Sequence, residues 1–304
     1  MLRYEIRALL RSPWILRSII LLSLIALIEL LFLTHTFISN IGPRSLTSSP
    51  FYGRGLTSTF GYQHAVIASG LSNHEKGQIA VLLLTSVDTV LALFISTILG
   101  AQSIACEVER NMLPLLRGSP LSLWRFSFIK VTTSSAATFF LLLTTLPAFA
   151  YIFTFHQLHG EELFIIVFQI VVAILSGVSI GFIWSVRLAS QAGATALGIV
   201  SILTVLAILT ILGLAQSKEH VLILSWLAIV HPLASVASWT GHDLAGLSAT
   251  VFPTVFKLSS LSFHFASWSV VVPLWCIPLL TWFLIASTLL LLSQVMLIRR
   301  YLWS

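Results

Sequence analysis

Two acidic side chains lie inside long apolar stretches of the sequence, where a carboxylate is costly. Glu29 falls within the stretch 15–38 and Asp88 within the stretch 79–105. In hydrocarbon such a group should face protein or water, carry a proton, or pair with another group. Two interpretations are open: the acids line a transport path or couple it to protons, or they form structural hydrogen bonds between spans. We expect both acids in the outer-to-middle part of the membrane, where they could approach one another.

A second group of charged residues belongs to the polar segment 106–127, which separates two apolar stretches. Glu107, Glu109 and Arg110 lie where the first of these stretches should leave the membrane. A simple reversal of the chain needs only a few polar residues. This segment instead combines acids, bases and an apolar patch interrupted by proline, which is typical of a docking surface.

The middle of this segment predicts a short helix. Asn111 can cap it and Gly118 is suited to end it. Ser119 and Pro120 then mark the next helix start, because serine caps helices and proline fits the first turn. Two interpretations are again open: a soluble partner docks here and moves both spans, or the segment is a lipid-facing turn anchored by Trp124. The residues that would contact a partner are Glu107, Glu109, Arg110, Asn111, Met112, Leu113, Leu115, Leu116 and Arg117.

The composition places these segments in an integral membrane protein. The chain has 304 residues, of which 57% are hydrophobic and 9% charged, and its mean hydropathy is +1.00. Soluble domains are about a quarter charged, and about 20 helical residues cross the bilayer core. The sequence predicts one all-α membrane domain with six transmembrane helices, at 15–38, 79–105, 128–155, 162–185, 192–215 and 270–298.

The distribution of Lys and Arg predicts the orientation of these spans. Basic residues are denser around 1–17, 106–130, 187 and 299–300 than in the longer loops of the other side. Positive charge favours the cytoplasmic side, so both termini should be cytoplasmic, as six spans require. We therefore expect a multi-pass protein of the inner (cytoplasmic) membrane. The bases flank spans and set topology, so no nucleic-acid partner is expected.

Two further elements are predicted outside the spans. Residues 1–14 have apolar residues at helical spacing, with Arg3, Arg7 and Arg11 on another face, which indicates an amphipathic interfacial helix. The extracellular region 216–269 contains an apolar piece that is too short to cross and is broken at His231, which predicts a re-entrant hairpin before the last span. An alternative with eight spans would need both apolar pieces of this region to cross.

One stretch resembles a known family. The run E-x-E-R-x-x-L-x-x-L-x-x-S-P-L from Glu107 to Leu121, followed by Lys130, is similar to the second cytoplasmic segment of type-2 ABC exporter permeases. In that family an acidic pair ends the second span, a coupling helix follows, and a Lys or Arg leads into the third span. The interfacial helix, the span count and the broken hairpin resemble the family too. The chain differs at Asn111-Met112, where the family often has Gly-Thr.

The resemblance implies a permease subunit that transports substrate outward and works with a second permease copy, identical or paralogous. It also implies a separate ABC ATP-binding subunit, whose groove would hold the coupling helix, here Asn111–Gly118, beside the N-terminal helix. ATP and Mg would bind to that partner. This chain has no G-x-x-x-x-G-K-[ST] motif, so we expect no cofactor on it and no enzyme activity of its own.

Other functions remain as alternatives. A secondary transporter would be driven by protons through Glu29 and Asp88. An intramembrane enzyme is disfavoured, because the Glu161-Glu162 pair has Ile166 where the corresponding protease family has arginine. The histidines are not clustered with further ligands, so no metal site is expected. The small residues Gly177, Gly181, Ala194 and Gly198 could serve dimerisation or packing within the chain.

Overall fold

The computed structural model describes residues 24, 73–109, 122–156, 160–188, 190–219, 260–265, 268–273 and 276–303. Several predicted elements lie outside these residues and stay predictions. They are the interfacial helix 1–14, the first span 15–38 apart from Leu24, the coupling helix 111–118 and the re-entrant hairpin within 221–240.

The described part of the chain is helical apart from one hairpin, and five of its segments are long and apolar enough to cross a membrane. These segments coincide with the second to sixth predicted spans, and they are the helices of a multi-pass membrane protein. In chain order they are α4 (Asn73–Glu109), α6 (Leu123–Leu142) continued by η3 (Leu143–Thr145) and α7 (Leu146–His156), α8 (Gly160–Arg187), α9 (Gln191–Glu219) and α13 (Cys276–Trp303).

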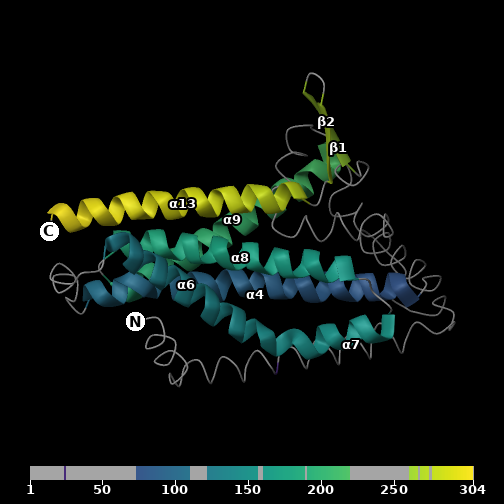
Figure 1. Cartoon of the computed structure of the whole chain (residues 1–304), viewed down its shortest axis with the longest axis horizontal. Helices are drawn as coiled ribbons and strands as arrows, with labels where there is room; N and C mark the ends of the chain where they lie inside the picture. Colours follow the sequence, from purple (N-terminus) through teal and green to yellow (C-terminus); the bar gives the residue numbers. More distant parts are fainter. Residues whose placement is uncertain are drawn as a thin grey trace.

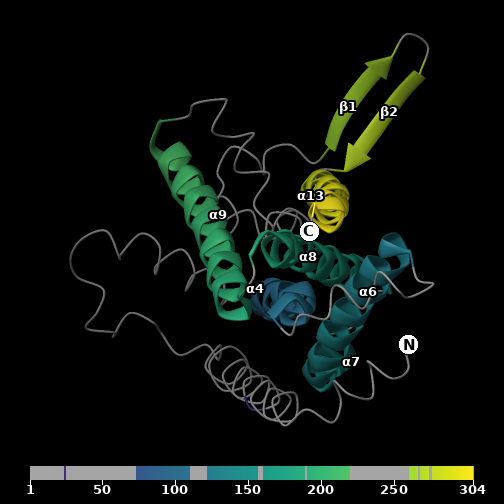
Figure 2. The same cartoon turned by 90° about the vertical axis from the view of Figure 1, so that its left-hand side faces the viewer.

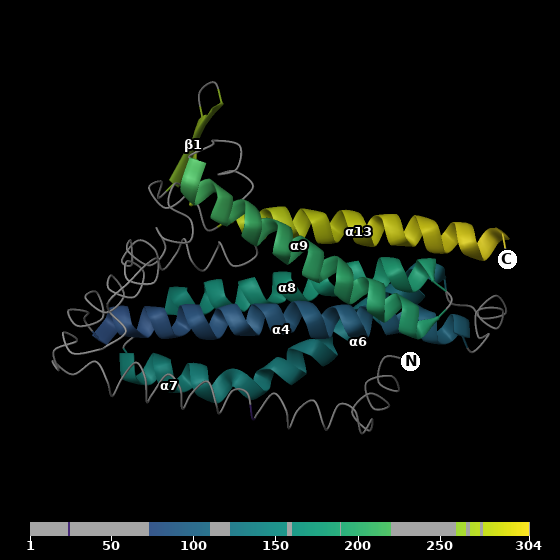
Figure 3. The same ribbon diagram turned by 180° about the vertical axis from the view of Figure 1, so that it is seen from behind.

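Helices α4 and α8 form the centre of the bundle and lie side by side (Figures 1 and 2). The α6–α7 segment flanks α4, α13 packs along α8, and α9 crosses both central helices obliquely (Figure 3). Helices α4, α8 and α13 end where α6 and α9 begin, and we call this the α4–α6 end of the bundle. The described bases at this end are Arg125, Lys130, Arg187, Arg299 and Arg300.

The predicted start of the helix that leads into the third span is wrong by a few residues. Helix α6 begins at Leu123, and its cap is Ser122 rather than Ser119, while the predicted start of the span itself, 128, lies within this helix. Ser122 has an extended backbone, and its hydroxyl accepts a hydrogen bond from the backbone N–H of Arg125 at 3.3 Å. This geometry satisfies an N–H group of the first turn that has no partner inside the helix.

The predicted start of the last span is also wrong. Helix α13 begins at Cys276, whereas residues 270–273 belong to a two-stranded antiparallel hairpin of β1 (Ser260–Phe265) and β2 (Trp268–Pro273). Three consecutive β-branched valines, 270–272, favour an extended strand over a helix. The hairpin lies at the opposite end of the bundle from the C-terminus (Figure 1).

The third span is a broken helix. Pro147 has no N–H group to donate to the carbonyl of Leu143, so the regular ladder is interrupted at the short η3 turn. The hydroxyls of Thr144 and Thr145 donate to the carbonyls of Leu141 and Leu142, at 2.8 and 2.7 Å. These side chains satisfy backbone groups at the break, which lies against α4.

Small residues allow α4 and α8 to approach closely. A Cβ atom on Gly177 would lie 2.6 Å from the carbonyl oxygen of Leu93, and one on Gly181 would lie 2.6 Å from the backbone nitrogen of Ala101. The hydroxyl of Thr97 donates to the Gly177 carbonyl at 3.0 Å. Of the two interpretations of the glycine pair, packing within the chain is therefore the one found. Ala194 of α9 likewise packs against alanines of α4.

Candidate functional site

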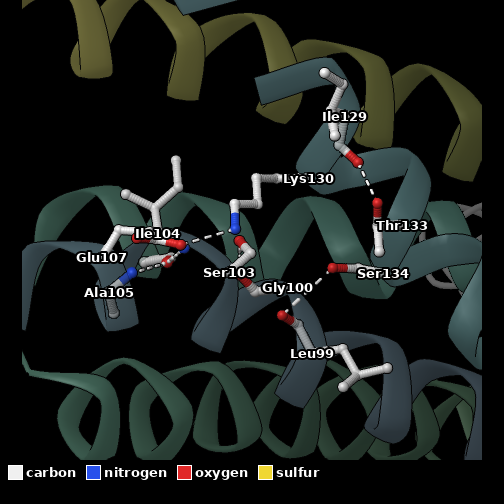
Figure 4. Close-up of polar contacts among 11 residues, drawn as sticks. Leu99, Gly100, Ser103, Ile104, Ala105, Glu107, Ile129, Lys130, Thr133 and Ser134 are labelled. Carbon is white, nitrogen blue, oxygen red and sulfur yellow. Dashed lines mark hydrogen bonds and ion pairs between the residues drawn. The ribbon is translucent and has the colours of Figure 1, made fainter. Parts of the chain in front are cut away.

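An ion pair joins the two helices that flank the predicted coupling segment. The Nζ atom of Lys130, on α6, lies 3.0 Å from Oε1 of Glu107, on α4 (Figure 4). The Lys130 side chain is 11% exposed and that of Glu107 is 25% exposed, so solvent screens the pair only in part. The ammonium group also lies 5.5 Å from the centre of the Phe126 ring.

This pair fixes the spacing of the helix ends. Glu107 lies in the last turn of α4, and Lys130 lies two turns into α6. The chain leaves α4 at Glu109, which is exposed, and returns at Ser122. A force on the residues between them would act on two helices that a charge-assisted hydrogen bond already holds together.

The same part of α4 is tied to α8 through Ser185. The Ser185 hydroxyl accepts hydrogen bonds from the backbone N–H groups of Ile104 and Ala105, at 2.8 and 2.7 Å. Such groups ordinarily donate to the carbonyl four residues earlier, so a side chain of α8 enters the hydrogen-bond ladder of α4. Nearby, the Ser103 hydroxyl donates to the Gly100 carbonyl at 2.6 Å.

Helix α6 adds a second tie to this region of α4. The Ser134 hydroxyl lies 3.5 Å from the Leu99 carbonyl and donates towards it, and Thr133 donates to Ile129 within its own helix (Figure 4). The stretch of α4 from residue 99 to 107 therefore bonds to both neighbouring helices through polar side chains.

Replacing Ser185 by alanine should destabilise the protein measurably. Two N–H groups of α4 would lose a side-chain acceptor from α8, and a lost hydrogen bond typically costs about 0.5–1.5 kcal/mol. The matched control is Ser179→Ala, because Ser179 is equally buried on α8 but its hydroxyl donates within its own helix, to Leu175. Thermal unfolding of the purified protein in detergent measures both. Equal shifts for the two variants would contradict the role given to Ser185.

Arg300 joins the last helix to the same end. Its Nη1 atom donates to the carbonyl of Val186 and lies 3.5 Å from the carbonyl of Leu188. These are carbonyls at the C-terminus of α8 that have no partner inside the helix, and a cation there also suits the helix dipole. The α4–α6 end thus joins α4, α6, α8 and α13 by polar contacts.

Asp88 occupies a separate buried site in the middle of α4. Its side chain is fully buried, and Oδ2 lies 2.9 Å from Oγ1 of Thr145, at the break in the third span. Thr145 also donates to Leu142, and a hydroxyl has a single hydrogen. Thr145 therefore directs its hydroxyl towards both the Leu142 carbonyl and the Asp88 carboxyl group, and links the break in the third span to α4.

The surroundings of Asp88 are polar. Thr85 and Thr89 lie within one helical turn of it, are fully buried, and have no hydrogen-bond partner for their hydroxyls among the described residues. Glu29 lies outside the described residues, so its approach to Asp88 stays a prediction. Asp88 thus forms a hydrogen bond to a neighbouring span, while the two interpretations of the intramembrane acids stay predictions.

The structure describes only part of the predicted site. Glu107, Glu109 and Asp88 are described, whereas Arg3, Arg7, Arg11, Glu29, Arg110, Asn111, Met112, Leu113, Leu115, Leu116 and Arg117 lie outside the described residues. Lys130 was expected as a base at the start of the third span, but its pairing with Glu107 was not. Ser185 was missed altogether, since serines inside spans usually bond to their own helix.

Comparison of the sequence with protein-family models finds no match, and comparison with curated proteins finds none either. The function of the chain is therefore argued from its own residues.

Proposed function

We propose that this chain is the membrane-spanning permease subunit of an ATP-driven ABC exporter. It would move substrate outward across the cytoplasmic membrane, with ATP hydrolysed by a separate ATP-binding subunit and a second permease copy completing the path. The observation that carries the proposal is the Glu107–Leu121 sequence pattern, together with the ion pair between Glu107 and Lys130 at its two ends.

The contacts at the α4–α6 end supply a mechanical route for this proposal. Closure of the ATP-binding subunits would displace the coupling helix Asn111–Gly118. Because Glu107 and Lys130 are bonded, α4 and α6 would move as a pair rather than separately. Ser185 would pass part of that displacement to α8 through the backbone of α4. A rigid connection of this kind is what a coupling element needs in order to bias two states of the bundle.

The charge distribution supports the orientation that the proposal requires. The described bases Arg125, Arg187 and Arg299 lie at the α4–α6 end, and Lys130 and Arg300 are held there by the contacts described above. Cytoplasmic loops are enriched in Lys and Arg. The proposed cytoplasmic side is therefore the side on which a soluble ATP-binding subunit would dock.

The test is purification of the tagged full chain from its native membrane, with identification of bound subunits by mass spectrometry. We expect an ABC ATP-binding subunit to copurify and the complex to hydrolyse ATP. A fourfold variant that reverses the charges of Glu107 and Glu109 and carries Leu113→Asp and Leu116→Asp should neither copurify with the ATP-binding subunit nor hydrolyse ATP. The matched control reverses Glu161 and Glu162, at the start of α8 on the opposite side. The proposal would be contradicted if no ATPase copurified with the tagged chain, or if the fourfold variant kept full activity.

A second candidate function is a proton-coupled transporter, favoured by the buried carboxyl of Asp88. The two candidates differ in their response to Asp88→Asn. Asparagine has nearly the same shape and its side-chain oxygen can accept from Thr145, so in an ATP-driven exporter the change should cost about 1 kcal/mol of stability and leave most of the transport intact. Abolished transport, together with its collapse in the presence of a protonophore at constant ATP, would instead support proton coupling.

A further inference from the structure

A cavity of about 370 Å³ lies among α8, α9 and α13. Its walls include Ile180 and Trp184 of α8, Val205 of α9 and Ile285 of α13. Pockets of 300 Å³ or more, roughly, are large enough for a small ligand or part of a larger one. Helices α9 and α13 both pack on α8 (Figure 2), and no part of the function proposed above uses the cavity.

The hydrogen-bonding groups of Trp184 and Ser201, in the described wall of the cavity, are already paired. Trp184 donates from Nε1 to the Ser201 hydroxyl at 2.9 Å, and that hydroxyl donates to the carbonyl of Leu197 at 2.7 Å. The remaining wall is made mainly of aliphatic and aromatic side chains. Because a buried polar group without a partner is costly, the interior suits hydrocarbon rather than a hydroxylated or amide-containing molecule.

Among the described residues, Arg187 is the one cation that lines the cavity. It is exposed and lies at the end of the membrane-spanning stretch Leu163–Arg187, where lipid headgroups begin. Its guanidinium carbon lies 5.8 Å from the centre of the Trp184 ring. Among the described residues no carboxylate pairs with Arg187, whereas the neighbouring Arg300 is bonded to carbonyls of the chain.

We propose that this cavity binds an anionic phospholipid of the leaflet at the α4–α6 end, with one acyl chain between the helices and the phosphate on Arg187. The dimensions agree with this ligand. Ile180 lies seven residues from Arg187, about 10 Å along a helix, and one leaflet of the hydrocarbon core is about 15 Å thick. Phosphate recognition by arginine uses paired N–H donors.

Two features favour an anionic lipid over a zwitterionic one. Arg187 lines the cavity, and Arg300 bonds to the adjacent carbonyl of Val186, so this end carries positive charge; basic pockets between transmembrane helices on the cytoplasmic side bind anionic headgroups. The ammonium group of a zwitterionic lipid would be repelled by the same positive charge. The proposal needs only the membrane location of the chain and does not depend on export or on ATP.

The experiment is native mass spectrometry of the purified full chain in detergent, titrated with phosphatidylglycerol and, separately, with phosphatidylcholine of the same acyl chains. We expect one saturable phosphatidylglycerol site and no comparable site for phosphatidylcholine. Arg187→Gln should weaken the site about fivefold, since a base near the surface contributes about 1 kcal/mol towards anionic lipid. Arg187→Lys should restore part of the affinity, because it keeps the positive charge but not the paired donors, and the matched control Arg299→Gln should leave the affinity unchanged.

A second variant tests the acyl chain independently of charge. Val205→Phe partly fills the cavity and should weaken phosphatidylglycerol binding without altering the bases. Equal affinity for the two lipids, equal behaviour of the Arg187 and Arg299 variants, or unchanged binding by Val205→Phe would overturn the proposal. If the chain forms dimers and Val205→Phe dissociates them, the cavity binds a second copy of the chain rather than a lipid. That result would also overturn the proposal.

Discussion

Replacing Gly181 by leucine should prevent α4 and α8 from packing and should leave little folded protein. A Cβ atom at this position would overlap the Thr97 carbonyl and would lie 2.6 Å from the backbone nitrogen of Ala101. Both obstacles are backbone atoms of the central helix, so no rotamer change relieves them. Overpacking a core typically costs about 1–3 kcal/mol, and here we expect the upper end or more. Size-exclusion chromatography and thermal unfolding in detergent measure the loss.

The matched control is Ala196→Leu on α9, which also introduces a large aliphatic side chain. Ala196 is exposed in the bundle and would face lipid. Lipid tails adapt to an added side chain, whereas helix–helix contacts in a membrane depend on close approach of small residues. The control should keep the melting temperature of the native protein. A Gly181→Leu variant that is as stable as the control would show that α4 and α8 are not packed as described.

The second to sixth spans could be predicted from the sequence because a bilayer imposes one strong requirement. Apolar stretches of sufficient length must be helical there, since their backbone groups have no water to bond. Span ends are less constrained, as α6 illustrates: both Ser119 and Ser122 could cap a helix, and only the backbone geometry shows that Ser122 does. The valines at 270–272 are equally apolar in a strand or a helix, so hydropathy alone placed them in the last span.

The candidate site could be predicted in part. Glu107 stood out because it begins a recognisable pattern, but the partner of an acid is set by helix register, which the sequence does not contain. The same limit applies to Ser185 and Ser179, which are both buried serines of α8 and differ only in the direction they face. For Asp88 the sequence left pairing, protonation and contact with water open, and the structure places it against Thr145, at the break in the third span.

Reversing the charge of Lys130 should uncouple transport from ATP hydrolysis. Exchanging the charges of Lys130 and Glu107 should restore that coupling. Lys130→Glu would place a second carboxylate near Glu107 in a partly buried position, in place of the ammonium group that now lies 3.0 Å from Oε1 of Glu107. The repulsion should separate the ends of α4 and α6. In the proposed mechanism, ATP-driven transport would fall about 5- to 150-fold, the range of a coupling free energy of about 1–3 kcal/mol. The double variant Lys130→Glu with Glu107→Lys should recover most of that loss.

The matched control for this prediction is Arg125→Glu. Arg125 is an exposed base of α6, one turn nearer its start than Lys130, and the change alters the net charge of the chain by the same amount. It should leave transport close to that of the native protein. Recovery by the double exchange would show that the bond itself, rather than positive charge at this end, carries the coupling. Lost transport in all three variants would assign the effect to general electrostatics, and native transport by Lys130→Glu would remove the ion pair from the mechanism.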